Sequence, residues 1–438
     1  MAETLKLTVI GAGYVGLATA IGLASRGHEI ELVEVRDDRL QSLRDGILPI
    51  HEPGMDEAFA DAAIRSRIHP TAHPENEHPD MLLVCVGTPV LESGRSDLSQ
   101  LKSALEAARP MLAGGTPLVL RSTLPPGSVD QIARWAEATL PLIFTNPEFL
   151  RQGTALEDFL DPTRVIIGTF AEPDPRALDM VSRVLRVEGA PFRVVTATEA
   201  EVIKNAANAF LSLKLSFTNE ISVLCEELGA DALTVLDGIG LDPRIGTRYM
   251  QPSYGFGGSC LPKELRALAN IGRDLGLEMH VTCAASDANE AHQRRFARRV
   301  AGLLPKGCTR VALLGLAFKA GTDDVRYSPA LRVAELLLDR GLDVVGYDPH
   351  AAANAARELP ALRIVDSAEA ALAGAGVAVI ATEWPEFRSL DWAGAGSHMA
   401  SRIVIDGRRL LDAQKMRALG YRFEAVGMAR SPHVHALS

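Results

Sequence analysis

The stretch Leu5-Lys-Leu-Thr-Val-Ile-Gly-Ala-Gly-Tyr-Val-Gly16 decides the fold of the first part of the chain. It joins an alternating strand pattern to a glycine turn, and the turn opens a helix of small residues that continues to Ser25. In a G-x-G-x-x-G turn the first glycine permits the tight bend, the second lets the backbone approach a pyrophosphate, and the third brings helix and strand together. The sequence therefore predicts a dinucleotide site at Gly11, Gly13 and Gly16.

The residues after this unit strengthen a motif that is weak by itself. Gly27 and His28 end the helix, and the segment 29–35 supplies a second strand that closes near Glu34. The dinucleotide fingerprint places an acidic residue about 20 residues after the turn, where it accepts hydrogen bonds from the adenine ribose. Glu34 favours NAD, because a carboxylate repels the extra phosphate of NADP. Arg36 leaves an alternative open, since an arginine there either meets a 2′-phosphate or is simply solvated.

Further apolar strands, each followed by a polar turn, continue the alternation. They are expected at 81–86, 117–120, 142–145, 165–168 and 192–195. The carboxyl ends of such strands meet at one edge of a doubly wound sheet, where ligands bind. We therefore expect Thr88, Thr123 and Glu148 to lie close together, although a helix cap is the better explanation of either threonine alone.

A long helix is predicted from Glu199 to Leu228, a stretch with neither proline nor glycine. Lys204 and Asn208 lie four residues apart and therefore share a face of this helix. Two interpretations stay open: the pair points inward beside a site, or it belongs to a polar stripe where helices pack. A second helix is predicted over 281–304. Because long helices that link two α/β units are natural dimerisation surfaces, we expect a homodimer built on the helix 199–228.

The stretch Tyr254-Gly-Phe-Gly-Gly-Ser-Cys-Leu-Pro-Lys-Glu264 places Cys260 between a glycine-rich loop and the start of a helix. Pro262 suits the first turn of that helix, which continues to Ala269. A helix N-terminus and the nearby Lys263 both lower the pKa of a thiol, and the thiolate is the nucleophile. Cys260 is therefore the first candidate for a catalytic residue. The alternative is an inert cysteine buried beside a turn.

A second α/β unit is predicted after the second helix, with strands at 309–315, 343–347, 377–380 and 402–405. Its first turn, Gly315-Leu-Ala-Phe-Lys-Ala-Gly321, lacks the G-x-G-x-x-G spacing, so we do not expect a second pyrophosphate site of the same kind. Cations in its loops could still hold a nucleotide diphosphate: Lys319, Arg326, Arg408 and Arg409. The predicted fold class is α/β, with two doubly wound Rossmann-like domains joined by a central helical domain with a long helix.

Composition excludes several classes of function. Hydrophobic residues make up 47% of the chain and charged residues 23%, which is typical of a globular protein, and no apolar run is long enough to span a membrane. A net charge of −10 argues against a nucleic-acid-binding surface. Five scattered cysteines without C-x-x-C pairs predict neither a disulfide framework nor a structural metal. The N-terminus runs into a strand without a signal segment, so we expect a cytoplasmic protein.

Taken together, these motifs resemble those of the nucleotide-sugar 6-dehydrogenases along nearly the whole chain. The matching segments occur in the family's order and approximate spacing: 11–17, 87–89, 122–123, 146–150, 204 with 206–209, 255–263, 315–319, 322–326 and 406–408. The resemblance implies an NAD-binding Rossmann domain at 1–197, a helical dimerisation domain with the cysteine loop at 198–305, and a nucleotide-sugar-binding domain at 306–438.

The resemblance also implies roles for individual residues. Cys260 would be the nucleophile, Glu148 a general base acting through water, and Lys204 and Asn208 the groups that stabilise an oxyanion. Thr123 and Glu264 complete the implied catalytic set. The implied cofactor residues are Gly11, Gly13, Val15, Gly16, Glu34, Arg39, Thr88, Thr123, Lys263 and Arg326. The implied substrate residues are Glu148, Phe149, Leu150, Lys204, Asn208, Arg244, Tyr249, Ser253, Gly257, Lys319 and Arg408, with Arg244 reaching across a dimer interface.

Two positions depart from the family pattern, which usually has Asp where this chain has Glu34 and Glu264. Glu34 keeps the charge and the expected function. Glu264 is longer by one methylene, and in an active site a misplacement of about 1 Å can cost about 100-fold in rate.

The implied activity is the oxidation of UDP-glucose to UDP-glucuronate with two molecules of NAD⁺, through a thiohemiacetal and a thioester on Cys260. The nearest alternative is a relative that acts on GDP-mannose or a UDP-hexosamine. A two-electron hydroxyacid or phosphosugar dehydrogenase would need neither Cys260 nor the second α/β unit. A non-catalytic alternative is a nucleotide-sugar-binding protein that has lost turnover through Glu264.

Overall fold

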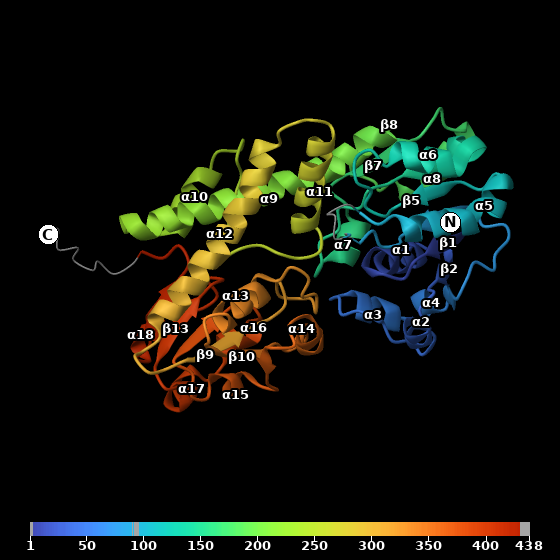
Figure 1. The fold of residues 1–438 in the computed structure, drawn as a ribbon. Coiled ribbons are helices and arrows are strands. Elements are labelled where there is room, and N and C mark those ends of the chain that lie inside the picture. The colour runs from blue at the N-terminus through green and yellow to red at the C-terminus, as the bar shows by residue number, and fades with distance from the viewer. Residues whose placement is uncertain (1–2, 90, 92–95, 430–438) are drawn as a thin grey trace. The chain divides into compact units, whose positions relative to one another are not determined.

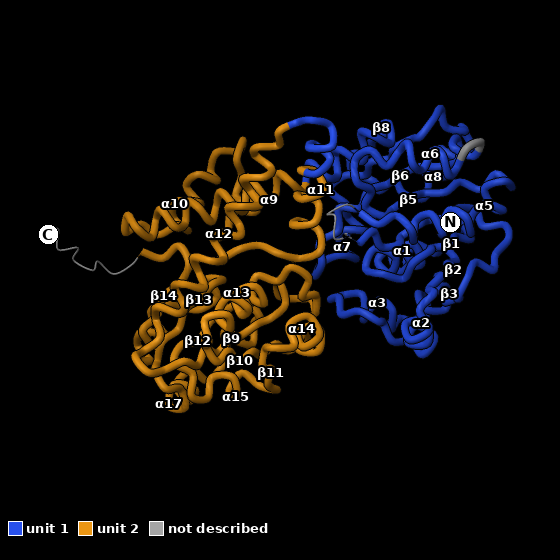
Figure 2. Tube along the Cα trace, in the orientation of Figure 1, with its two compact units in different colours: residues 1–207, 270–277 blue, residues 208–269, 278–438 orange. Residues whose placement is uncertain are grey.

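The structure, a computed structural model, describes residues 3–89, 91 and 96–429 (Figure 1). The chain forms two compact units (Figure 2). Unit 1 comprises Met1–Ala207 and Asn270–Leu277, and unit 2 comprises Asn208–Ala269 and Glu278–Ser438. Each unit contains one sheet of its own.

The sheet of unit 1 has eight strands in the order β3-β2-β1-β4-β5-β6-β7-β8. All neighbouring strands pair in parallel except β6 and β7, which are antiparallel. The strands are β1 (Lys6–Ile10), β2 (Glu29–Val33), β3 (Ile68–Thr71), β4 (Met81–Val84), β5 (Leu118–Leu120), β6 (Ile143–Thr145), β7 (Val165–Thr169) and β8 (Phe192–Thr196). The strand order reverses between β1 and β4, and ligands bind at such a switch point in open α/β sheets.

Helices and apolar side chains cover both faces of this sheet. Successive residues of β1 enter different clusters, since Val9 packs with Leu17 and Ile21 of α1 whereas Ile10 packs with the cluster that includes α5. Burial on both faces explains why the central strands β4 (MLLV) and β5 (LVL) are continuous apolar runs. The helices are α1 (Tyr14–Ser25), α2 (Asp37–Arg44), α3 (Met55–Ala60), α4 (Ala62–Arg65), α5 (Ser99–Ala113), α6 (Val129–Ala136), α7 (Ala155–Leu160) and α8 (Pro175–Leu185), with a 3-10 helix at Glu137–Leu142.

Four helices lie between the two sheets in sequence: α9 (Ala197–Leu228), α10 (Ala232–Gly240), α11 (Leu261–Asp274) and α12 (His280–Leu303). Helix α9 has 32 residues and runs from unit 1 into unit 2. Neither proline nor glycine interrupts it, as its sequence predicts.

The sheet of unit 2 has six parallel strands in the order β11-β10-β9-β12-β13-β14. These are β9 (Arg310–Leu314), β10 (Asp343–Tyr347), β11 (Arg363–Ile364), β12 (Val377–Ile380), β13 (Ile403–Asp406) and β14 (Arg422–Ala425). The accompanying helices are α13 (Pro329–Leu338), α14 (Ala352–Glu358), α15 (Ala368–Leu372), α16 (Pro385–Ser389), α17 (Trp392–His398) and α18 (Ala413–Ala418). One apolar cluster joins this sheet to Tyr254 and to Phe296 of α12.

The predicted fold class is confirmed: two parallel-sheet Rossmann-like units and a long central helix are present. Strands β3, β11 and β14 were not predicted. They lie at sheet edges, and β3 includes Pro70, which weakens a strand pattern. The three-domain boundaries at 197 and 305 stay a prediction. In the described part of the chain, no helix combines the length and apolarity that a membrane span requires.

Candidate active site

The glycine turn between β1 and α1 requires glycine at two of its three glycine positions. Gly11 has a φ of +99°, which other residues rarely adopt, and a Cβ on Gly16 would lie 1.8 Å from the carbonyl oxygen of Gly11. A Cβ on Gly13 would meet nothing within 4 Å. Gly13 caps α1 without a side-chain hydrogen bond, and the first turn, which includes Val15, contains no acidic residue. The residues at this helix N-terminus therefore fit an anionic cofactor.

Glu34 lies just after β2, and its side chain is buried beside the turn. Its Oε1 accepts a hydrogen bond from the Arg36 amide at 2.9 Å, and its Oε2 lies 3.7 Å from Nε of Arg39. Arg39 also donates from Nη2 to the Ala12 carbonyl within the glycine turn at 2.7 Å. Arg36 forms an exposed ion pair with Asp38 at 2.7 Å. Glu34 as the group that meets the ribose stays a prediction.

The turns after β4 and β5 are joined by a hydrogen bond between two predicted site residues. The hydroxyl of Thr88 donates to the carbonyl oxygen of Thr123 at 3.0 Å. Neither threonine caps a helix, because α5 begins at Ser99 and α6 at Val129. The expected proximity of these two residues is confirmed, and the alternative of a helix cap is wrong for both.

Glu148 and Lys204 form a buried ion pair within unit 1. Nζ of Lys204 lies 3.2 Å from Oε1 of Glu148, and the two side chains are only 3% and 5% exposed. Oε2 of Glu148 accepts from the Leu150 amide at 2.7 Å, so both carboxylate oxygens are engaged. Nζ of Lys204 also lies 5.4 Å from the centre of the Phe149 ring. The predicted base thus has a fixed orientation and a counter-ion.

Cys260 immediately precedes α11, and its carbonyl accepts the first helical hydrogen bond, from the Glu264 amide at 2.9 Å. The thiol is half-buried and lies 3.6 Å from the hydroxyl of Ser259. Its position at a helix N-terminus favours the thiolate. Cys85 is different, because burial raises the pKa of its thiol to about 11. Cys260 is thus less buried than Cys85, and its role as the nucleophile stays a prediction.

A second buried contact links the long helix to the cysteine helix within unit 2. Nδ2 of Asn208 donates to Oε2 of Glu264 at 2.7 Å, and both residues are buried. Glu264 thus orients the amide of Asn208. The first turn of α11 also carries Lys263.

The loop 322–328 supports the glycine residues before Cys260. The Gly258 amide donates to the Arg326 carbonyl at 3.1 Å, and a Cβ on Gly257 would lie 2.1 Å from the carbonyl oxygen of Tyr327. Burial acts to lower the pKa of Arg326, but hydrogen bonds to Asp324 and Coulombic attraction by Asp324 and Cys260 raise it above its ordinary value. The coupling is mutual, so Arg326 favours the Cys260 thiolate.

The remaining predicted substrate residues all lie in unit 2. Ser253 is held by Asn219, whose Oδ1 accepts from the Ser253 amide at 2.8 Å. Arg408 donates to the carbonyls of Ala381 and Phe318 at 2.8 Å each. Arg244 is exposed and forms an ion pair with Asp242 at 2.6 Å. Tyr249 adopts a φ of +62°, and Nζ of Lys319 lies 6.0 Å from the ring centre of Phe318.

The first turn of the second sheet is filled by a carboxylate of the protein itself. Asp348 follows β10, and its Oδ2 accepts from the amides of Leu316 at 2.7 Å and Ala317 at 3.0 Å. The indole of Trp384 donates to the same oxygen at 3.0 Å. These are the turn amides that would otherwise bind a phosphate. In this turn the amides of Leu316 and Ala317 are therefore bonded to a side chain of the protein.

Sequence reasoning missed the function of most polar residues in α9. A buried stripe at helical spacing runs along it: Glu201, Asn205, Asn208, Ser212, Ser216, Asn219, Ser222 and Glu226. Several of these side chains bind backbone groups elsewhere, such as the Gly427 amide, which donates to Glu226 at 2.7 Å. The spacing of three and four residues was the available signal. Lys204 and Asn208 are both buried, as either interpretation requires, and their role beside a site stays a prediction.

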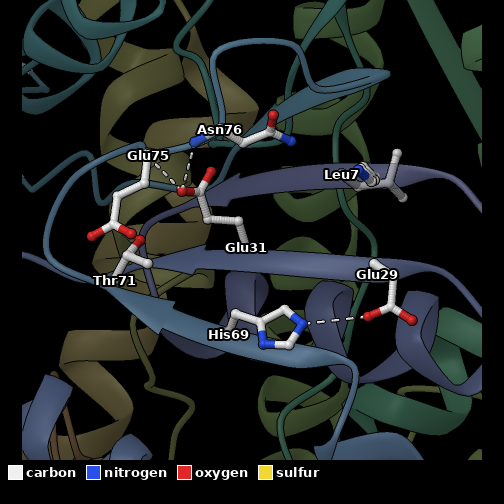
Figure 3. Close-up of a pocket in the computed structure, with 8 residues that line it drawn as sticks. Leu7, Glu29, Glu31, His69, Thr71, Glu75 and Asn76 are labelled. Atoms are coloured by element: carbon white, nitrogen blue, oxygen red, sulfur yellow. Dashed lines mark hydrogen bonds and ion pairs between the residues drawn. The ribbon is translucent and has the colours of Figure 1, made fainter.

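A hollow of about 480 Å³ lies over β1–β3 of unit 1 (Figure 3). Two of its carboxylates are engaged, because Glu31 accepts from the amides of Glu75 and Asn76, and Glu29 pairs with His69 (Figure 3). The glycine turn does not line it. Within the described residues there is also no group of three or more His, Cys, Asp or Glu side chains that could hold a metal ion.

The fold and the glycine turn define a dinucleotide-binding protein with a second α/β unit. The NAD binding domain of the UDP-glucose/GDP-mannose dehydrogenase family matches residues 5–186, its central domain residues 198–291, and its UDP binding domain residues 312–413. The chain belongs to the UDP-glucose/GDP-mannose dehydrogenase family. The predicted resemblance is thereby confirmed, NAD is the cofactor, and the UDP binding domain indicates a nucleotide-sugar ligand.

Individual relatives match over nearly the whole chain. The UDP-glucose 6-dehydrogenase of Rhizobium meliloti is 36% identical over 436 residues, which cover 97% of this chain and 99% of that protein. The UDP-glucose 6-dehydrogenase of Haloferax volcanii is 38% identical, with 93% of this chain and 97% of that protein covered. Among solved structures, a UDP-glucose dehydrogenase from Pyrobaculum islandicum matches with a TM-score of 0.85 and 37% identity over 98% of both chains. A UDP-D-ManNAc dehydrogenase from Pyrococcus horikoshii matches with a TM-score of 0.81 and 27% identity over 97% of this chain and 99% of that one.

Proposed function

We propose that this protein is an NAD-dependent dehydrogenase that oxidises UDP-glucose to UDP-glucuronate. The observation that carries the proposal is Cys260, a half-buried thiol at a helix start, in a chain that also has a dinucleotide turn. An alcohol dehydrogenation alone needs no thiol, whereas oxidation of an alcohol to an acid needs a covalent carrier for the aldehyde. The relatives named as UDP-glucose dehydrogenases support the choice of sugar.

The proposed reaction has two oxidation steps and one hydrolysis. NAD⁺, when bound, supplies the acceptor for each hydride. Removal of a hydride and a proton from the primary alcohol gives an aldehyde. The Cys260 thiolate adds to its carbonyl carbon to form the C–S bond, and the resulting alkoxide takes up a proton to give a thiohemiacetal. Loss of a second hydride and a proton gives a thioester. Water then breaks the C–S bond, which releases the acid and returns the thiolate.

The resemblance to the family assigns roles in this scheme to individual polar residues. Lys204 and Asn208, one turn apart on α9, would stabilise the oxyanions at the reacting carbon. Glu148 would take the proton of the attacking water, and its bond to the Leu150 amide fixes the carboxylate for that task. Glu264, which binds Asn208 at 2.7 Å, would orient the amide donor.

We predict that purified protein produces two NADH for each UDP-glucose consumed. One NADH per sugar would indicate a two-electron dehydrogenase, and none would indicate a nucleotide-sugar-binding protein without turnover. The count is made by absorbance at limiting sugar, with the acid identified by mass spectrometry. GDP-mannose and UDP-hexosamines are assayed in parallel, and a kcat/KM for either that exceeds the value for UDP-glucose would contradict the proposed substrate.

We further propose a homodimer in which α9 packs against a second copy of the chain. Helix α9 is polar on its buried side, yet it exposes Phe210, Phe217, Leu224 and Leu228, at 62%, 48%, 52% and 74%. Their spacing of seven, seven and four places them on one face. A helix that buries polar groups and exposes large apolar ones is expected to cover the apolar face with a partner.

Sedimentation at micromolar concentration tests the homodimer. We expect a dimer for the wild type and a shift toward monomer for Phe210→Asp/Phe217→Asp, because two charges would be buried without partners. Val35→Asp, at another exposed apolar position, serves as the control. A wild type that sediments as a fully active monomer would refute the interface and the reach of Arg244 into a neighbouring site.

The state of the cysteines supports a proposal about the compartment. All five are free thiols, including the exposed Cys283. Free thiols fit a reducing compartment. We propose that the enzyme works in the cytoplasm.

A further inference from the structure

We infer that Glu201, a residue without a role in the chemistry above, is a positioning residue that fixes the loop 122–128 and thereby holds Thr123 for cofactor binding. The inference rests on the proposed function only in assigning Thr123 to the NAD site. Every contact that carries it lies within unit 1.

Helix α9 holds this loop at two points. Oε2 of Glu201 accepts from the Gly127 amide at 2.9 Å, near the end of the loop. One helical turn later, Nδ2 of Asn205 donates to the Leu124 carbonyl at 2.9 Å and to the Glu201 carbonyl at 2.8 Å. Glu201 and Asn205 are each 1% exposed. A partly buried contact at Gly127 and a buried contact at Leu124, about one helical turn apart on α9, attach the loop to the helix.

The same helical turn connects the loop to the rest of the candidate site. Thr123 lies next to Leu124, and its carbonyl accepts the Thr88 hydroxyl at 3.0 Å. Lys204 lies between Glu201 and Asn205 in this turn and pairs with Glu148 at 3.2 Å. A shift of the loop away from α9 would therefore change the position of Thr123 relative to Lys204.

The surroundings of Glu201 favour its neutral form. Burial raises the pKa of Glu201 to about 8, the amides of Gly127 and Ser128 lower it in part, and Asp130 of α6 raises it further. Oε1 has no hydrogen-bond partner among the described residues, and no cation there pairs with this carboxyl group. Ionisation would bury a charge without a counter-ion, so the loop must open to hydrate it.

The sign of the pH effect follows from the raised pKa. Below pH about 8 the native protein keeps the Glu201 proton that the unfolded chain releases near its ordinary pKa of 4.5. Native stability from this group is therefore greatest at low pH and is lost as the pH rises through 8. We expect the loop to be attached at neutral pH and to loosen above pH 8.

The test measures the Kd of NAD⁺ by calorimetry, without sugar, from pH 6.5 to 9.5. For the wild type we expect the Kd to rise about tenfold or more between pH 7 and 9.5, because the competent fraction falls as Glu201 ionises. Glu201→Gln keeps an acceptor oxygen for the Gly127 amide but cannot ionise, so its Kd should lack this rise. Glu201→Ala should bind NAD⁺ about tenfold more weakly at pH 7.

The matched control is Glu199→Gln, the same change two residues earlier on α9. Glu199 is exposed and bonds to Thr196, so this variant should follow the wild-type curve. A Glu201→Gln curve identical to the wild type, or a Glu201→Ala Kd within about twofold of it, would overturn the inference. If Glu201→Ala does not fold, the Gln variant decides. If the protein binds NAD⁺ with these profiles but does not oxidise UDP-glucose, the proposed function is wrong and the inference about Glu201 stands.

Discussion

Replacing Cys260 by alanine is expected to abolish formation of the acid, with a loss in rate on the order of 10⁴-fold or more. The thiolate is assigned to covalent capture of the aldehyde and not to ground-state affinity. The Kd values for NAD⁺ and for UDP-glucose should therefore change by less than about threefold. The measurement combines calorimetry with product analysis by mass spectrometry.

The serine variant at the same position separates two functions of the thiol. A serine hydroxyl can add to an aldehyde, but it is a poorer nucleophile and a poorer leaving group. Cys260→Ser should therefore accumulate an acyl-enzyme that mass spectrometry detects, with very slow turnover. Cys283→Ala removes an exposed thiol of α12 and serves as the control. If Cys260→Ala forms two NADH per sugar at nearly the wild-type rate, the proposed mechanism is wrong.

The cysteine loop shows what sequence could and could not establish. Cys260 could be predicted because Gly255–Gly258 and Pro262 are local signals for a loop and a helix start. The contact between the Gly258 amide and the Arg326 carbonyl joins residues 68 positions apart, and no local pattern encodes it. The coupling of Cys260 to Arg326 likewise required the three-dimensional arrangement.

The glycine turns after β1 and β9 also show which features of the two sheets can be predicted from the sequence. Both follow an apolar strand, and the spacing alone distinguished the first as a dinucleotide site. That Asp348 occupies the amides of Leu316 and Ala317 could not be predicted, because the aspartate enters from the next strand in the chain. In α9 the spacing of the buried polar residues is visible in the sequence. Their partners could not be predicted, because residues such as Leu124 and Gly127 lie in a loop that is distant in sequence.

The pair formed by Lys204 and Glu148 gives the second large effect that we expect. Lys204→Met should reduce kcat about 100- to 1,000-fold, because a donor aimed at the oxyanion is lost. It should also destabilise the protein by about 3–5 kcal/mol, since Glu148 remains as a buried charge without its partner. Glu148→Gln should reduce the free energy of unfolding by a similar amount, because Lys204 then remains as a buried charge without its partner. The same variant should trap the thioester on Cys260, because hydrolysis is slowed.

The double variant Lys204→Met/Glu148→Gln separates catalysis from folding. Both buried charges are then removed, so the free energy of unfolding from urea titration should recover by roughly 2 kcal/mol or more relative to the sum of the single changes. The activity should not recover, because the donor and the base are both absent. Recovery of activity together with stability would show that the two residues serve only packing. Additive losses of stability would show that the 3.2 Å contact is not an energetically coupled ion pair.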